Sequence, residues 1–319
     1  MDGVDRMLIL ASAINIKDEC EEANSKGVFN KMKALIIMLV ILTATSLSNA
    51  HAATFKIFCD SQVERASKSC AIKITGVIKK GDSAKLLRII KTPVKKGWSY
   101  GDILLDSPGG DVSEAMEIAK LVRKYMLRTS TTHSRGDPER LESKRFYSCI
   151  SSCFLVWVAG TERFSFNGYD QIEGQHYGIG LHRPYFPSHV YGYSPAKVSE
   201  IHKSINALIR EYLQQEQVPD LFIEQMLERS SKEIYWAGNR GMEFSLNGRA
   251  PWFEEMMIAR CGFDPAYDRE SEWRISDQIS RTGVSEHYTP DSITERYQHW
   301  RQKYNSCAHS IRLKAQIDD

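Results

Sequence analysis

The chain has 319 residues, enough for one sizeable hydrophobic core or for one core with a small satellite domain. Its 42 Lys and Arg residues nearly balance its 40 Asp and Glu residues, and no basic run is interleaved with aromatic residues. Because nucleic-acid-binding proteins concentrate positive charge in patches or stripes, nucleic acid is not expected as a partner.

The N-terminal region has the order of segments that is typical of a secretory signal peptide. The Lys-Met-Lys sequence at 31–33 precedes a mostly apolar stretch at 34–47, and Ala-His-Ala follows at 50–52. We therefore expect residues 32–52 to be the signal peptide, Met32 to be the true start, and residues 1–31 to be a non-native upstream extension. The mature chain would then be periplasmic or secreted. The alternative is an uncleaved membrane anchor, although the apolar stretch is short for a membrane span.

Strands alternate with helices over residues 54–248, and such alternation predicts an α/β fold. The expected strands are 54–59, 70–78, 101–106, 127–132, 164–166 and 179–182. The expected helices are 83–90, 111–126, a buried apolar helix at 149–159, 194–215 and 220–229. From residue 249 onward aromatic and charged residues mix, so 249–319 is predicted to be a small helical C-terminal region.

Six cysteines follow the expected signal peptide, an even number that favours disulfides in an exported protein. Proximity in the sequence favours the pairs Cys59–Cys70, Cys149–Cys153 and Cys261–Cys307. For Cys149 and Cys153 the alternative is two buried thiols. A zinc site is a weaker alternative for the cysteines, because neither a C-x-x-C pair nor clustered histidines support it. No metal or other cofactor is expected.

Three short segments carry residue types that acyl transfer needs. An apolar strand at 103–105 runs into Ser-Pro-Gly-Gly at 107–110, whose glycine N–H groups can approach a substrate. Ser151 stands at the start of an apolar run, where it could be a nucleophile or only a helix cap. His182 follows a short apolar stretch and could be the general base. His176 and His189 compete with it, but both lie in Gly-, Tyr- and Pro-rich stretches.

These segments together resemble the ClpP-like serine peptidases of the ClpP/crotonase fold superfamily, over roughly residues 70–240. The resemblance implies a spiral of ββα units at 54–248, with Ser151 as the catalytic nucleophile and His182 as its base. It also implies an oxyanion hole formed by the backbone N–H groups of Gly110 and Ser152. Since that donor is a backbone group, Ser152→Ala is expected to be mild. The cysteines that bracket Ser151 resemble those of exported bacterial ClpP-like proteins.

The third member of the triad departs from the family pattern. An ungapped comparison places Ser230 where the family carries its aspartate. Glu233 and Glu228 are the nearest carboxylates, and Glu233 is assigned here as the third catalytic residue.

The sequence therefore predicts an exported serine hydrolase, most simply a peptidase acting on peptides or proteins. A catalytically silent module for binding or assembly is the alternative, because the aspartate is missing. A crotonase-like acyl-CoA enzyme is a distant third, since CoA is not expected outside the cytosol. The helix at 194–215 occupies the place of the family's subunit-contact helix, so the resemblance implies a homo-oligomer; no ATPase partner is expected.

Overall fold

The structure is a computed structural model that describes residues 52–59, 69–92, 98–131, 147–165, 168–170, 175–185, 192–230, 232–237, 246–271 and 292–317. The expected upstream extension and all of the expected signal peptide except Ala52 lie outside these residues, as does His189. Ser151, His182 and the Ser-Pro-Gly-Gly segment at 107–110 all lie within them.

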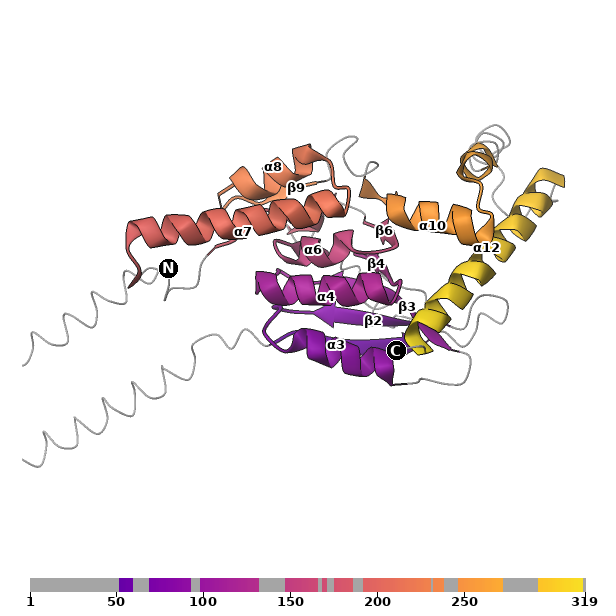
Figure 1. Ribbon diagram of the computed structural model, residues 1–319, viewed down its shortest axis with the longest axis horizontal. Coiled ribbons are helices and arrows are strands. Elements are labelled where there is room, and N and C mark those ends of the chain that lie inside the picture. Colours follow the sequence, from indigo (N-terminus) through magenta and orange to yellow (C-terminus); the bar gives the residue numbers. More distant parts are fainter. Residues whose placement is uncertain are drawn as a thin grey trace, which may run out of the picture. The chain divides into compact units, whose positions relative to one another are not determined.

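The larger sheet has six strands in the order β1-β2-β3-β4-β6-β10 (Figure 1). These strands are β1 (Thr54–Cys59), β2 (Ser69–Thr75), β3 (Ser99–Asp106), β4 (Arg128–Ser130), β6 (Glu162–Phe164) and β10 (Gly248–Arg249). The four inner strands run parallel, while β1 and β10 are antiparallel to their neighbours. Parallel inner strands separated by helices are what the strand–helix alternation predicts.

A second, four-stranded sheet is built around β8 (Gln175–Leu181). On one side β8 pairs in parallel with β5 (Ser148–Ile150), and it pairs antiparallel with β7 (Gly168–Asp170) and β9 (Tyr235–Trp236). An isolated parallel bridge between Ser107 and Cys149 joins this sheet to the end of β3. The carboxyl ends of β3, β5 and β8 are thereby brought together.

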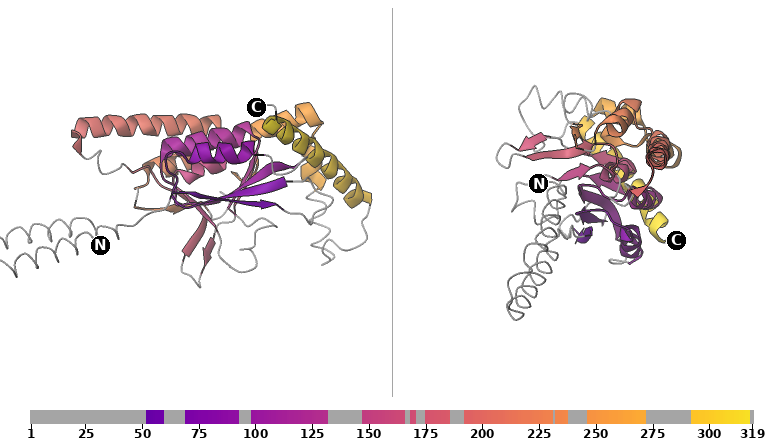
Figure 2. Two further views of the ribbon diagram at one scale, coloured as in Figure 1. Left: turned by 90° about the horizontal axis from the view of Figure 1, so that it is seen from below. Right: turned by 90° about the vertical axis from the view of Figure 1, so that its left-hand side faces the viewer.

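Helices cover one face of the larger sheet (Figure 2). These are α3 (Asp82–Lys91), α4 (Val112–Lys124) and α6 (Cys153–Val158), which pack with α7 (Pro195–Gln215) and α8 (Asp220–Glu228). Every residue of α6 is buried, and the buried apolar residues of α4 lie at helical spacing. One continuous hydrophobic core joins these helices to β2 and β3.

The main error of the sequence prediction is the helix at 149–159. Cys149 and Ile150 belong to strand β5, and the helix spans only Cys153–Val158. The reason is tertiary pairing: the Ile150 N–H donates to the Ser107 carbonyl at 2.9 Å, and Cys149 pairs with Ile179. A short apolar strand that leads into a buried helix has no change of periodicity at the boundary.

The C-terminal region contributes α10 (Pro251–Cys261) and α12 (Ser292–Ile317). A second small cluster of buried residues joins these helices, and it includes Phe253, Met257, Phe263 and Tyr304. Helix α12 also reaches the larger sheet, where the Gln316 side-chain amide donates to the Tyr100 carbonyl at 2.8 Å and accepts from the Tyr100 N–H at 2.9 Å. The helical character of this region follows the sequence prediction.

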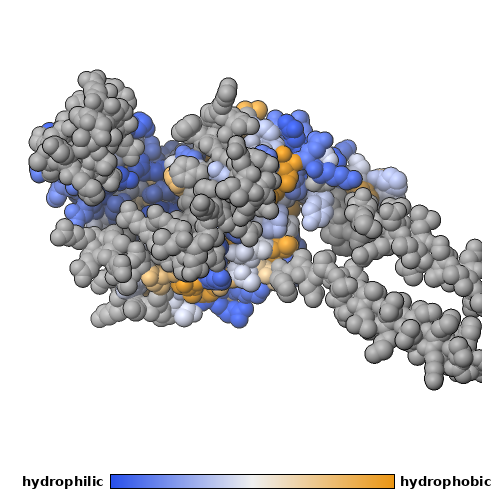
Figure 3. All heavy atoms as spheres, turned by 180° about the vertical axis from the view of Figure 1, so that it is seen from behind, coloured by the Kyte–Doolittle hydropathy of each residue, from blue (hydrophilic) through white to orange (hydrophobic). Residues whose placement is uncertain are grey.

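The structure confirms all three predicted disulfides, Cys59–Cys70, Cys149–Cys153 and Cys261–Cys307. Disulfides are typical of proteins in oxidising compartments, in line with an extracytoplasmic location. Among the described helices, none has the length and apolar character of a membrane span. On the face shown in Figure 3, hydrophobic residues of the described chain form small separate spots among hydrophilic ones.

Candidate active site

Ser151 lies in a tight turn between β5 and α6. Its backbone adopts a left-handed conformation with φ of 58°, which costs a non-glycine residue roughly 1–2 kcal/mol. The Ser151 N–H donates to the Gly180 carbonyl at 2.9 Å, so β8 holds the turn in this conformation. Ser151 itself is 6% exposed. A strained serine between a strand and a helix is typical of nucleophile turns.

The turn formed by residues 107–110 packs directly against Ser151. A Cβ atom at Gly109 would lie 2.9 Å from Ser151 Cβ and 3.0 Å from the Ser152 nitrogen, and one at Gly110 would lie 2.1 Å from the Ile78 carbonyl oxygen. Both glycines also have positive φ, 89° and 149°. Only glycine fits at these two positions, because any side chain would collide with backbone atoms.

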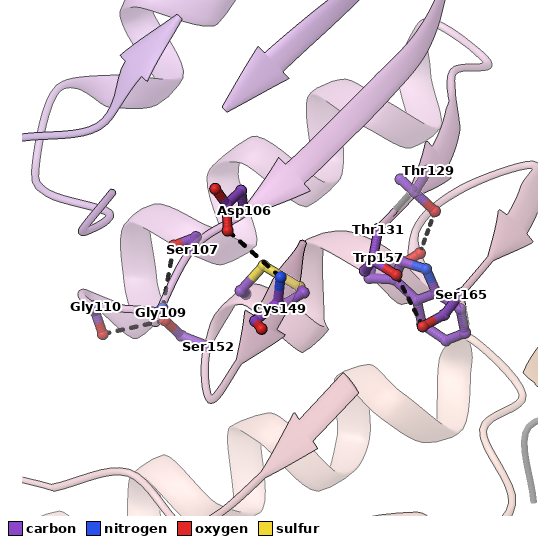
Figure 4. Close-up of a disulfide and its surroundings, with 12 residues drawn as sticks. Asp106, Ser107, Gly109, Gly110, Thr129, Thr131, Cys149, Ser152, Trp157 and Ser165 are labelled. Atoms are coloured by element: carbon purple, nitrogen blue, oxygen red, sulfur yellow. Dashed lines mark hydrogen bonds between the residues drawn. A yellow bond between two sulfur atoms is a disulfide. The ribbon is translucent and has the colours of Figure 1, made fainter. Parts of the chain in front are cut away.

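The backbone of the glycine turn is fixed on several sides (Figure 4). The Ile78 N–H donates to the Gly109 carbonyl at 2.9 Å, and the Gly109 N–H donates to Ser107 Oγ at 3.1 Å. In the described part of the chain, the N–H groups of Gly110 and Ser152 donate no hydrogen bond. These two unbonded donors are therefore available to an oxyanion at Ser151.

His182 follows the last residue of β8, just as Ser151 follows the last residue of β5. Ile150 pairs with Gly180 in parallel register, so Ser151 and His182 both follow the carboxyl ends of neighbouring parallel strands. His182 is 6% exposed, and its Nδ1 lies 2.8 Å from the Arg183 carbonyl oxygen. A carbonyl oxygen only accepts hydrogen bonds, so this contact assigns a proton to Nδ1; in the neutral ring, Nε2 is then the nitrogen with the lone pair.

The structure does not form the Ser151–His182 hydrogen bond. Within the described residues, neither Ser151 Oγ nor His182 Nε2 has a hydrogen-bond partner. In unliganded enzymes such bonds are often long or poorly aligned and tighten only when substrate binds. Ser151 and His182 therefore follow paired strands at the same end of the sheet without a hydrogen bond between them.

The carboxylates named from the sequence do not contact His182 in the described structure. Glu233 is exposed, and its N–H donates to the Ser230 carbonyl at 3.0 Å. The antiparallel β8–β9 ladder ends at the pair of Leu181 with Tyr235, and beyond it the Arg183 N–H donates to the Arg229 carbonyl at 3.3 Å. Glu228, at the end of α8, is also exposed. His176, one of the competing histidines, is exposed and stacks on Trp236 with ring centroids 5.2 Å apart.

Two hydroxyl groups near the site form hydrogen bonds that the sequence prediction missed. Ser107 Oγ donates to the Gly76 carbonyl at 2.6 Å while accepting from Gly109, and Ser152 Oγ donates to the Gly110 carbonyl at 3.2 Å. The Ser-Pro-Gly-Gly motif contains the first of these hydroxyls. No local pattern marks the second, because its partner lies 42 positions away.

Neighbouring elements hold the two turns in place. Asp111 caps α4 by accepting from the Glu114 N–H at 2.9 Å, and the Glu114 carboxylate accepts from the Ser83 N–H at 2.6 Å. Burial raises the pKa of Glu114, but hydrogen bonds from Ser83, Gly81 and Asp82 together outweigh it and leave the pKa below its usual value. On the other side, Tyr212 of α7 donates to the Leu155 carbonyl of α6 at 2.8 Å, and burial raises the pKa of Tyr212 well above its usual value.

Comparison with known proteins gives one distant structural similarity. No family model matches the chain, and no curated protein matches its sequence. Among solved structures, the chain is similar to a serine-to-alanine mutant of the 1510-N membrane-bound stomatin-specific protease, with 16% identity and a TM-score of 0.32. That match covers 52% of this chain and 70% of the other. At this level of similarity, any function proposed for the chain depends on the site itself.

Proposed function

We propose that this chain is an exported serine hydrolase, specifically a peptidase, with Ser151 as nucleophile and His182 as general base. One observation carries the proposal: the left-handed Ser151 turn packs against a glycine turn, and the N–H groups of Gly110 and Ser152 have no other partner among the described residues. Unbonded donors beside a strained serine are what a tetrahedral oxyanion requires.

The tautomer of His182 supports its role as the base. In the neutral ring with Nδ1–H donated to the Arg183 carbonyl, Nε2 takes the hydroxyl proton as Ser151 Oγ attacks a substrate carbonyl. The same nitrogen then returns that proton to the leaving amine, and water hydrolyses the acyl-serine with His182 again as base. In this proposal a backbone carbonyl orients the imidazole, and Glu233 has at most an indirect role.

The resemblance to ClpP-like peptidases favours peptide or protein substrates, and it extends to a ClpP/crotonase-like spiral for residues 54–248. The strand–turn–helix order around Gly109 and around Ser151 supports this extension. Export rests on the signal-like segment at 32–52, which lies almost entirely outside the described residues.

A specific observation favours the alternative of a catalytically silent binding or assembly module. In the described structure Ser151 Oγ is not hydrogen-bonded to His182, and no carboxylate contacts His182. A site that keeps this geometry with substrate bound would not activate its serine.

Labelling with a fluorophosphonate separates these two functions. In the reaction the Ser151 Oγ–P bond forms, the P–F bond breaks, fluoride leaves with its electron pair, and the hydroxyl proton passes to His182 Nε2. Wild type should be labelled, while Ser151→Ala, His182→Ala and the double variant should lose similar amounts of reactivity because the two residues act as a unit. Equal labelling of wild type and Ser151→Ala would exclude Ser151 as the nucleophile, and an unreactive wild type would favour the silent module.

We also propose that the chain forms a homo-oligomer through the N-terminal half of α7. Figure 1 shows this half running out beyond α4 and α6, and in the half with Val198 and Ile201 no residue is buried. The second copy of the chain is the proposed occupant, as the family resemblance implies. Light scattering should give a mass well above that of one chain; a monomer at all concentrations would exclude this.

A further inference from the structure

The residue after the proposed nucleophile, Ser152, contains two groups that face the same site. Its backbone N–H is one of the two unbonded donors, and its side chain is fully buried with no exposed surface. Ser152 Oγ donates to the Gly110 carbonyl at 3.2 Å, as Figure 4 shows. The side chain of one donor residue is therefore hydrogen-bonded to the other donor residue.

The hydrogen bonds around Gly110 fix the peptides on both of its sides. The Ile78 N–H holds the Gly109 carbonyl, and a trans peptide directs its N–H away from its carbonyl, so the Gly110 N–H points away from Ile78. The next peptide begins with the Gly110 carbonyl, which Ser152 Oγ holds, and ends with the Asp111 N–H, which donates to the Ile78 carbonyl at 2.9 Å. Gly110 has no side chain of its own to limit its rotation.

We propose that Ser152 is a positioning residue of the oxyanion hole, whose hydroxyl holds Gly110 so that the two donor N–H groups converge on one oxyanion. This inference rests on the proposed hydrolase function. It revises the sequence-based expectation that Ser152→Ala is mild, because that expectation considered only the backbone N–H. The competing interpretation is that the hydroxyl only satisfies a buried carbonyl and adds to stability.

Thr161 offers a matched control for this competing interpretation. Thr161 is also fully buried, and its Oγ1 donates to the Leu127 carbonyl at 3.3 Å, with no contact to the site. Ser152→Ala and Thr161→Val each remove one buried hydroxyl from one backbone carbonyl. A purely structural role predicts that both variants unfold more easily and that both react normally while folded.

The test measures the second-order rate of fluorophosphonate labelling for folded wild type, Ser152→Ala, Ser152→Thr and Thr161→Val. Ser152→Ala should slow labelling by roughly tenfold or more, short of the roughly 10²- to 10³-fold loss expected when a donor itself is removed. Thr161→Val should react like wild type. Ser152→Thr keeps the hydroxyl, so it should retain most of the rate even if Ser152→Ala does not fold.

The outcomes separate this inference from the proposed function. If wild type and Ser152→Ala are labelled equally fast, the positioning role is wrong, while the proposed hydrolase function stands. Loss of the rate in folded Ser152→Thr also overturns it, because side-chain volume rather than the hydroxyl would then be decisive. A wild type that does not react overturns the hydrolase function, and the catalytic role of Ser152 falls with it.

Discussion

The nucleophile turn and the C-terminal helices each contain a disulfide, but the two bonds join very different lengths of chain. Cys149 and Cys153 are four positions apart, and both lie in the main core between β5 and α6. Cys261 and Cys307 are 46 positions apart and join α10 to α12, whose own apolar cluster is small. The same covalent bond therefore acts in one region that strand pairing already fixes and in another that is built around a small apolar cluster of its own.

A disulfide can therefore stabilise the fold by restricting the unfolded chain, or it can fix the conformation of a turn, and these two effects can be measured separately. A cross-link restricts the unfolded chain more as its loop grows, so the longer loop carries the larger effect on stability. The shorter loop encloses Ser151 and Ser152, so its bond restricts the turn that holds the proposed nucleophile and one proposed oxyanion donor. We therefore expect the Cys261–Cys307 bond to act mainly on stability and the Cys149–Cys153 bond to act mainly on the geometry of the proposed site.

Removing the long-range disulfide should have the largest effect on stability. Cys261→Ala with Cys307→Ala should lower the free energy of unfolding by about 4 kcal/mol, because its loop of 46 positions is then free in the unfolded chain. Urea denaturation measures this loss. Labelling by fluorophosphonate should be unchanged while the protein is folded, and a large drop in labelling of folded protein would contradict the division of functions.

Removing the short-range disulfide should change stability less and the rate of labelling more. Cys149→Ala with Cys153→Ala should cost about 2 kcal/mol through loop closure, yet slow labelling by roughly tenfold or more, because the oxyanion donor at Ser152 loses its constraint. Cys59→Ala with Cys70→Ala is the matched control, since it opens a loop of 11 positions at the edge strand β1. Equal labelling rates in the two pairs of variants would refute the catalytic assignment.

Acidic pH should weaken the attachment of α12 to the larger sheet. Burial lowers the pKa of His309, and nearby Arg312 lowers it further; the ring also lies 3.2 Å from Ser99 Oγ. A histidine whose pKa is lowered by folding binds a proton more readily in the unfolded chain. Its contribution to the free energy of unfolding is therefore complete above the unfolded pKa of about 6.5. That contribution is lost as pH falls through the folded pKa.

The pH dependence of unfolding in wild type and His309→Asn measures this effect. Below the unfolded pKa, stability should fall less steeply in the variant than in wild type. His299→Asn, on an exposed position of the same helix, is the control and should follow wild type. Parallel curves for wild type and His309→Asn would contradict the assignment to His309.

Replacing Glu233 should have the smallest effect of all. Glu233 is exposed, and His182 Nδ1 already contacts the Arg183 carbonyl. Glu233→Gln should therefore leave both the rate of labelling and its dependence on pH close to wild type. A loss comparable with that of His182→Ala would restore Glu233 as the third member of a triad.

Much of the fold follows from the sequence because long helices and strands have clear periodicity. The capped helix from Pro195 to Gln215 and the strand that leads into Ser107 were predicted within one or two residues. Strand β5 was not, because it has three residues and depends on pairing with Gly178–Gly180, which lie 30 positions further along the chain. Local propensity carries no information about such a partner.

Some features of the candidate site could likewise be predicted from the sequence, while others depend on tertiary packing. Ser151, His182 and the glycines were predicted because their residue types and order are distinctive, and their catalytic roles stay a prediction. The partner of His182 was not, since it is a backbone carbonyl and every residue has one. The bond from Ser152 to Gly110 was missed because it forms only when two turns, 42 positions apart, pack together.

The most direct test of the central claim is to locate a fluorophosphonate adduct on the oxidised, mature protein by peptide mass spectrometry. We expect one phosphonyl group on the peptide that contains Ser151 and Ser152, with fragmentation assigning it to Ser151. An adduct on any other residue, or no adduct on wild type, would contradict the claim that the left-handed turn at Ser151 presents a catalytic nucleophile.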